Sequence, residues 1–202
     1  MSAKKVAGLL CAATCLAMCA ALCGAPAQAQ GMGNSQMAMP GSASLTNDIL
    51  GQWNRVGNLL LGMAKDFPED KFDYRATPSE RTFAEQILHA TAASAAFAGM
   101  AEGVMPKSFD EVEKPSREKY KTRAEIVEFI QKTFADGAAE IQKLGDKGLL
   151  EATDSPFEKG QKVTRAWMFT FAVAHAYDHY GQCAVYYRLN GLVPPESRNQ
   201  PM

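Results

Sequence analysis

The sequence carries almost no net charge. Its 202 residues include 21 lysine and arginine side chains and 22 aspartate and glutamate side chains, which give a formal charge of -1. Proteins that bind nucleic acid through its phosphates carry a clear excess of basic residues. The charge balance excludes a broad basic interface, and we expect no nucleic-acid partner.

Several catalytic motifs are also missing. There is no glycine-rich phosphate loop, no serine nucleophile elbow and no pair of cysteines separated by two residues. The sequence therefore gives no support for ATP-dependent, serine-hydrolase or thioredoxin-like chemistry. Its content of 47% hydrophobic and 21% charged residues is typical of a globular domain with one core.

The first 29 residues have the pattern of a signal peptide. Lys4 and Lys5 precede an uncharged apolar run over residues 6–24, and the small residues Ala27 and Ala29 mark a cleavage site. We expect cleavage after Ala29, export to the periplasm or the medium, and no membrane anchor afterwards. The alternative is a retained anchor, because the run approaches the length of about 20 residues that spans a bilayer.

Cysteine is scarce in the chain that remains after this cleavage. Four of the five cysteines lie within residues 1–29, and only Cys183 follows them. A single cysteine excludes an intrachain disulfide, although an exported compartment would permit one. The stability of the folded chain must then come from its packed core.

Residues 30–45 are rich in glycine, serine, methionine and glutamine and carry no charge. We expect a flexible leader here, because this composition cannot bury enough apolar surface to offset its ordering entropy. Met32, Met37 and Met39 could bind monovalent copper through their thioethers, or their grouping could be incidental.

The remaining chain has helical periodicity. Apolar residues recur about every 3.6 positions in four stretches, and no stretch alternates with period two for long enough to indicate a sheet. The predicted helices cover residues 46–65, 82–100, 122–144 and 161–190. They indicate an all-α domain, followed by a short tail over residues 198–202. The connections of about 15 to 20 residues are too long for tight hairpins and favour a four-helix bundle with a crossover connection.

Local signals mark the ends of these helices. Thr82 with Glu85, and Thr122 with Glu125, have the spacing of capping boxes at two helix starts. Gly191 is placed to end the last helix in a left-handed conformation. The residues expected to face the core from the first helix are Ile49, Trp53, Val56, Leu60 and Met63.

The aromatic residues of the predicted helices are assigned to packing. Rings at helical spacing usually belong to the core of a bundle. The residues assigned in this way are Trp53, Trp167, Phe169 and Phe171.

Only three histidines occur, and all three fall in predicted helices. His175 and His179 lie on one helix face one turn apart. His89 lies in the second predicted helix, and ligands from facing helices converge in the core of a bundle. Three neutral imidazoles suit a divalent ion such as zinc, nickel or iron and leave positions open for water or a substrate. The alternative is that the histidines are hydrogen-bonded core residues without a metal.

Residues near the histidines could orient them or cover them. A ligating histidine usually donates its other ring N–H to an oxygen atom, and Gln182, three residues after His179, is placed to accept it. Asp178 is a second candidate partner, but it points about 100° away from His179, which favours a solvated or salt-bridged role. Cys183 could flank the site as a redox-sensitive ligand, or be a small buried apolar residue. The charged segment 107–123 is either a solvated connection or a cover over the site.

Three segments resemble motifs of the DinB/YfiT-like family. They are RTFAEQILH at residues 81–89, HAYDHYGQ at residues 175–182 and YRLNGLVPP at residues 187–195. The resemblance spans residues 46–197, and the order and spacing of all three histidines fit it. It implies a four-helix bundle with a crossover connection, in which the three histidines hold a divalent metal ion.

The resemblance also implies a reaction. In the family, the metal site activates a low-molecular-weight thiol for transfer to an electrophile or assists an isomerisation that uses such a thiol. The residues leave hydrolysis open, because a bound metal activates either a thiol or water. A non-catalytic metal-binding or interaction module of the cell envelope is a further alternative. An enzyme of this kind would act on a small-molecule substrate. A homodimer is also possible, because homodimers are common among small helical bundles.

Overall fold

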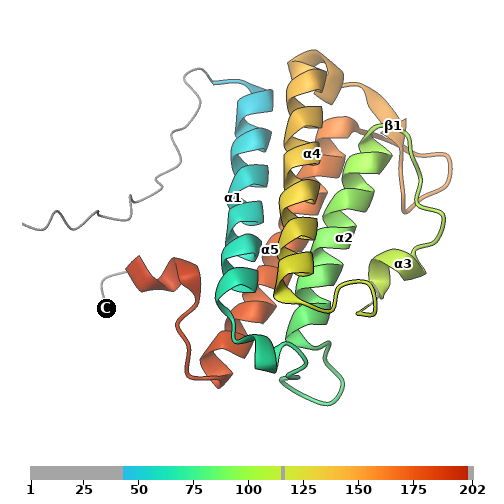
Figure 1. Ribbon diagram of the computed structural model, residues 1–202. Coiled ribbons are helices and arrows are strands. Elements are labelled where there is room, and N and C mark those ends of the chain that lie inside the picture. The colour runs from blue at the N-terminus through green and yellow to red at the C-terminus, as the bar shows by residue number, and fades with distance from the viewer. Residues whose placement is uncertain (1–42, 115–116, 200–202) are drawn as a thin grey trace, which may run out of the picture. The chain divides into compact units, whose positions relative to one another are not determined.

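Four long helices contain most of the residues that the structure describes. The computed structural model describes residues 43–114 and 117–199 (Figure 1). Its long helices are α1 (Leu45–Asp66), α2 (Phe83–Ala101), α4 (Arg123–Leu149) and α5 (Arg165–Leu189). The predicted all-α four-helix bundle is therefore confirmed. The predicted signal peptide and almost all of the predicted leader lie outside the described residues.

Shorter elements occupy the connections between these helices. One 3-10 helix covers Glu69–Lys71, α3 covers Asp110–Glu113, and a second 3-10 helix covers Pro195–Asn199. Strands β1 (Ala152–Asp154) and β2 (Lys162–Thr164) pair antiparallel in the connection between α4 and α5. Among the described residues, no helix combines the length and apolar character needed to cross a membrane.

Helices that follow one another in the chain are not always neighbours in the bundle. α1 packs mainly on α4 and α5, and α2 packs mainly on α5 and α4, so α1 and α2 lie across a diagonal. α2 and α4 run in the same direction, and the connection that contains α3 passes along the outside of the bundle (Figure 1). This parallel pair requires the predicted crossover connection.

Side-chain caps set the helix starts. Thr82 Oγ1 accepts from the Glu85 amide at 3.1 Å, and the Glu85 carboxylate accepts from the Thr82 amide at 2.7 Å. Thr122 and Glu125 repeat the arrangement at the start of α4. Both predicted capping boxes are confirmed, and Gly191 has the expected left-handed φ of 71° after α5.

Two helix ends differ from the prediction. α5 begins at Arg165 rather than at residue 161, because the residues before it form β2. A strand of three residues is too short for alternation to be visible in the sequence. α4 continues to Leu149 rather than ending at residue 144, and it is broken at Gly145, whose φ of 58° is non-helical.

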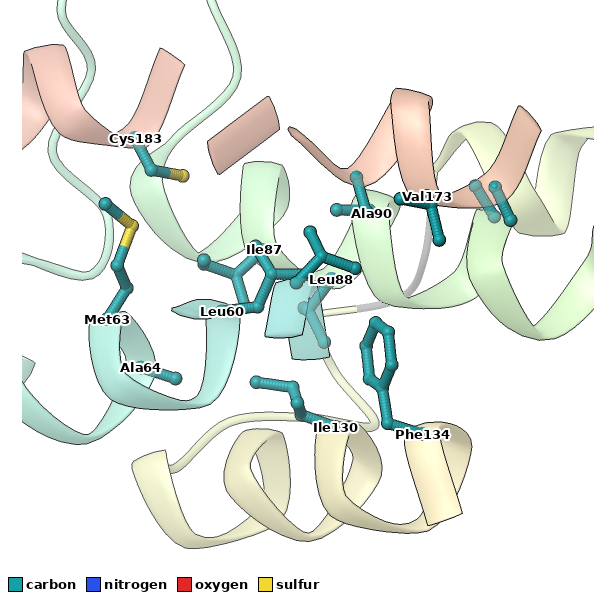
Figure 2. Close-up of a cluster of buried hydrophobic side chains, with 14 of the residues drawn as sticks. Leu60, Met63, Ala64, Ile87, Leu88, Ala90, Ile130, Phe134, Val173 and Cys183 are labelled. Carbon is teal, nitrogen blue, oxygen red and sulfur yellow. The ribbon is translucent and has the colours of Figure 1, made fainter. Parts of the chain in front are cut away.

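All four long helices contribute side chains to the core. Figure 2 shows Leu60 of α1, Ile87 of α2, Ile130 of α4 and Val173 of α5 in one buried apolar cluster. The five residues predicted to face the core from the first helix are all buried. Each large apolar side chain that is fully buried contributes about 1.5–3 kcal/mol relative to exposure. The core thus fixes the positions of the four helices relative to one another, including the packing of α2 against α5.

α1 and α4 approach each other closely at two glycines. A Cβ atom at Gly57 would lie 2.5 Å from the Phe134 ring, and one at Gly137 would lie 2.2 Å from the Trp53 ring. Trp53 Nε1 also donates to the Phe134 carbonyl oxygen at 2.9 Å. Glycine at these two positions therefore makes room for the two aromatic rings between the helices.

Candidate metal centre

Three histidines from two neighbouring helices converge in the bundle. His89 lies in α2, and His175 and His179 lie one turn apart in α5, which packs against α2. One nitrogen of each imidazole lies within 4.8 Å of a nitrogen of each of the other two. The ring centroids are 4.5 to 5.1 Å apart. The fold therefore brings together the three histidines that the sequence singles out, and their role as metal ligands stays a prediction.

The cluster is buried on one side and open on the other. His89 and His179 have exposed fractions of 3% and 4%, whereas His175 is partly exposed. Of the three imidazoles, that of His175 is therefore the one with the most contact with solvent.

Hydrogen bonds fix the orientation of two of the three rings. His89 Nδ1 lies 2.8 Å from the Val112 carbonyl oxygen, and His179 Nδ1 lies 2.8 Å from Gln86 Oε1. A carbonyl oxygen only accepts, so both Nδ1 atoms carry the proton and each Nε2 atom keeps its lone pair. His175 Nε2 lies 3.2 Å from His89 Nε2, so these two nitrogens face the same point.

A chain of hydrogen bonds sets the direction of the contact between Gln86 and His179. Gln86 Nε2 donates to Gln182 Oε1 at 2.8 Å, and Gln182 Nε2 donates to Asp178 Oδ2 at 3.0 Å. The Asp178 carboxylate only accepts, so both amides must present their NH₂ groups towards it and their oxygens towards His179. The Glu80 carboxylate, 3.5 Å from Gln86 Nε2, is a second acceptor on the same side.

Gln182 does not contact His179, so its predicted role as the acceptor for the His179 N–H is wrong. Gln86 makes that contact, and Gln182 instead accepts a hydrogen bond from Gln86. Sequence patterns did not single out Gln86, although its position three residues before His89 puts both on one face of α2. The charged connection 107–123 contains Val112, so part of it lies against the site.

Cys183 lies in the apolar core. It is fully buried, and Figure 2 shows it in the same cluster as Met63 and Leu60. Burial raises the pKa of its thiol well above the usual range, because the charged thiolate loses solvent there. The residue is therefore a neutral apolar side chain at neutral pH.

Burial lowers the pKa of all three histidines. Loss of solvent is the main cause at each, and it lowers the pKa of His179 from 6.5 to about 3, with a further contribution from the charges on His175 and His89. At His89 the hydrogen bond to the Val112 carbonyl acts in the opposite direction. The imidazoles are consequently neutral at pH 7, which is the form that binds a metal ion.

The chemistry of these donors fits a divalent transition metal. Zinc, nickel and iron all accept imidazole nitrogen, and three protein ligands leave at least one position open. Outer N–H groups bonded to oxygen atoms, as at His89 and His179, are typical of histidines that ligate a metal. Within the described part of the chain, the cluster contains no carboxylate or thiol ligand. The donor set is therefore uncharged.

Comparisons with known proteins show the family and the fold of this chain. The sequence model of the DinB superfamily matches residues 52–183, which include all three histidines. A DinB-like protein of known structure from Bacillus subtilis is 18% identical, with a TM-score of 0.57 over 76% of this chain and 99% of that chain. Another, from Bacillus cereus, is 17% identical, with a TM-score of 0.59 over 73% of this chain and 93% of that chain. These two structures show the same fold, and no curated protein matches the chain significantly.

Proposed function

Because this chain belongs to the DinB superfamily, we propose that it holds one divalent metal ion on His89, His175 and His179. The observation that carries the proposal is the convergence of three ligating nitrogens within 4.8 Å of one another. Zinc, nickel and iron are the candidate ions, since each accepts neutral imidazole.

We further propose that the site serves a transferase that joins a low-molecular-weight thiol to an electrophile. A divalent ion stabilises the thiolate, which is the nucleophilic form of a thiol. The residues of the chain prepare the site: Val112 and Gln86 hold two imidazoles with their lone pairs inward, and the exposed side of His175 admits the substrates. In the reaction a sulfur–carbon bond forms, the leaving group departs with its electron pair, and the thiol proton passes to solvent.

Thiol-dependent consumption of an electrophile tests this reaction. N-acetylcysteine and 1-chloro-2,4-dinitrobenzene are suitable probes, because the coupled product absorbs light and chloride is the leaving group. We expect the zinc-loaded protein to exceed the rate of zinc alone, and His175→Ala to remove the gain. Cys183→Ala is the matched control, since it removes a thiol buried in the core and is expected to keep the rate.

A second assay, with 4-nitrophenyl acetate and no thiol, tests the alternative of hydrolysis. Absence of the thiol-dependent reaction together with turnover of this ester, lost in His175→Ala, would contradict the transferase and indicate a hydrolase. Metal uptake without turnover of either probe would favour a non-catalytic metal-binding module.

We also propose that the protein acts outside the cytoplasm. The support for export is the sequence pattern of residues 1–29, in which a basic start, an apolar run and a small-residue cleavage site follow one another.

A further inference from the structure

Aromatic rings continue the row of histidines along α5. Trp167, Phe171, His175 and His179 are each four residues apart, so they share one face of the helix. The rings of Trp167 and Phe171 are stacked, with centroids 5.1 Å apart and planes 22° apart. The rings of Phe171 and His175 have centroids 6.3 Å apart and planes 12° apart. A row of nearly parallel rings therefore leads away from the histidine cluster.

Two further rings widen this row. Phe97 of α2 lies with its ring centroid 4.7 Å from that of Phe171. Phe157, in the connection between β1 and β2, lies 5.2 Å from Phe171 and 6.0 Å from Trp167. We call Phe97, Phe157, Trp167 and Phe171 the aromatic strip. It is built where α2, α5 and the hairpin meet, beside the histidines.

The aromatic strip is not closed off from solvent in the way that the core is. Phe157 is 60% exposed, and Trp167 and Phe171 are partly exposed; Phe97 is buried beneath them, and Trp53 in the core has no exposed surface. Packing therefore accounts for Trp53 but leaves ring surface of the strip uncovered. Apolar and aromatic surface beside a few polar groups is the usual lining of a small-molecule site.

The neighbourhood of the histidines also contains charge. Arg81, just before α2, forms an ion pair with Glu113 of α3 at 2.7 Å. These two charges act on His89 in opposite directions, Arg81 lowering its pKa and Glu113 raising it. A ligand at the histidines therefore has both polar and aromatic surroundings, and the strip is the part that suits an apolar group.

Building on the metal site proposed above, we propose that the aromatic strip binds a flat aromatic group of the substrate while the reactive group of that substrate lies at the histidines. The ring of Phe171 is the link between the two, because it stacks on the ring of Trp167 and its centroid lies 6.3 Å from that of the His175 ring. Stacked and edge-to-face ring pairs add affinity beyond the burial of apolar area. The strip therefore selects substrates with an aromatic ring over saturated ones.

Binding of three thiols to the cobalt-loaded protein tests this selection. 2-Phenylethanethiol, 2-cyclohexylethanethiol and ethanethiol present closely similar alkanethiol sulfur ligands, but only the first carries an aromatic ring. Absorption from thiolate-to-cobalt charge transfer reports each affinity without any turnover. We expect 2-phenylethanethiol to bind about fivefold to tenfold more tightly than either saturated thiol.

Variants of the strip are expected to remove this preference. Phe171→Leu removes the ring next to His175, and Phe157→Leu removes the most exposed ring, whose loss does not open the core. Both should bring the preference below about twofold. Phe129→Leu is the matched control, because Phe129 stacks on Tyr120 at 4.6 Å in another part of the bundle. It should keep the full preference.

The outcomes separate the strip from the metal site. Equal affinities of the three thiols in the unaltered protein, or a preference that survives both strip variants, would overturn the strip as a substrate site and leave the metal site standing. Failure to take up cobalt would overturn the metal site itself, and with it the substrate site that depends on it.

Discussion

Gln86 Oε1 lies 2.8 Å from His179 Nδ1, and this contact joins the candidate metal ligands to hydrogen bonds that end at the Asp178 carboxylate. Because the carboxylate only accepts, Gln86 must accept from His179. The lone pair of His179 Nε2 is thereby kept free for a ligand. Gln86 thus positions the His179 imidazole, and at the proposed metal site it would act on the ion through this histidine.

Replacing Gln86 by leucine tests this role. Gln86→Leu removes the acceptor for the His179 N–H, so the imidazole loses its fixed orientation and tautomer. Loss of such an outer partner typically weakens metal binding by about 10-fold to 100-fold. Competition with a chromophoric zinc chelator measures the affinity. Gln131→Leu, on the exposed side of α4, is the matched control and is expected to bind zinc as the unaltered chain does. Equal affinities of the two variants would show that Gln86 plays no positioning role.

The pKa of His179 predicts how the stability of the metal-free protein depends on pH. Its pKa is lowered from 6.5 to about 3 in the folded chain, so below pH 6.5 the unfolded chain binds more protons than the folded one. The free energy of unfolding is therefore unaffected by this group above pH 6.5 and falls as the pH falls towards 3. The expected loss is about 1 kcal/mol between pH 6 and pH 5.

Urea unfolding of the metal-free protein at a series of pH values measures this dependence. His179→Gln removes the contribution of this group and is expected to make the curve shallower between pH 6 and pH 5, while His89 and His175, whose pKa values are also lowered by burial, keep theirs. An unchanged slope in the variant would mean that His179 is not held neutral by burial.

The close approach of α1 and α4 predicts opposite effects of two alanine substitutions in one helix. Gly57→Ala would place a Cβ atom 2.5 Å from the Phe134 ring, and overpacking of this kind costs about 1–3 kcal/mol. Gly51→Ala meets nothing within 4 Å and is expected to stabilise the helix by up to about 1 kcal/mol. Thermal unfolding followed by circular dichroism compares them. The packing is different from that described here if both variants are equally stable.

Export predicts a defined start of the mature chain. We expect the protein recovered from the exported fraction to begin at Gln30, because the small residues Ala27 and Ala29 lie at the positions that signal peptidase reads. Ala27→Arg should block cleavage, whereas Gln28→Arg, between the two small residues, should not. Intact mass spectrometry distinguishes the products. An exported protein that still begins at its first residues would favour the retained anchor.

Features that depend on neighbouring residues in the sequence were predictable. The starts of α2 and α4 follow from Thr82 with Glu85 and from Thr122 with Glu125, because a capping box is formed within one helical turn. The shared face of His175 and His179 also follows from helical geometry alone.

Features that depend on packing between distant segments were not predictable. Nothing in the sequence indicates that the Val112 carbonyl accepts from His89, because the path of the connection through α3 decides it. Trp167 and Phe171 pack against the core, as their helical spacing predicts. Their spacing does not indicate that both keep some exposed surface, because that depends on which segments pack over them.

Elemental analysis tests the central claim most directly. The protein should be purified without a polyhistidine tag, beside His89→Ala and beside Cys183→Ala as a control that leaves all three histidines in place. We predict about one zinc, nickel or iron ion per chain in the unaltered protein and in the control, and none in His89→Ala. No metal in the unaltered protein, or the same metal content in His89→Ala, would contradict the three-histidine site. The three histidines would then be hydrogen-bonded core residues without a metal.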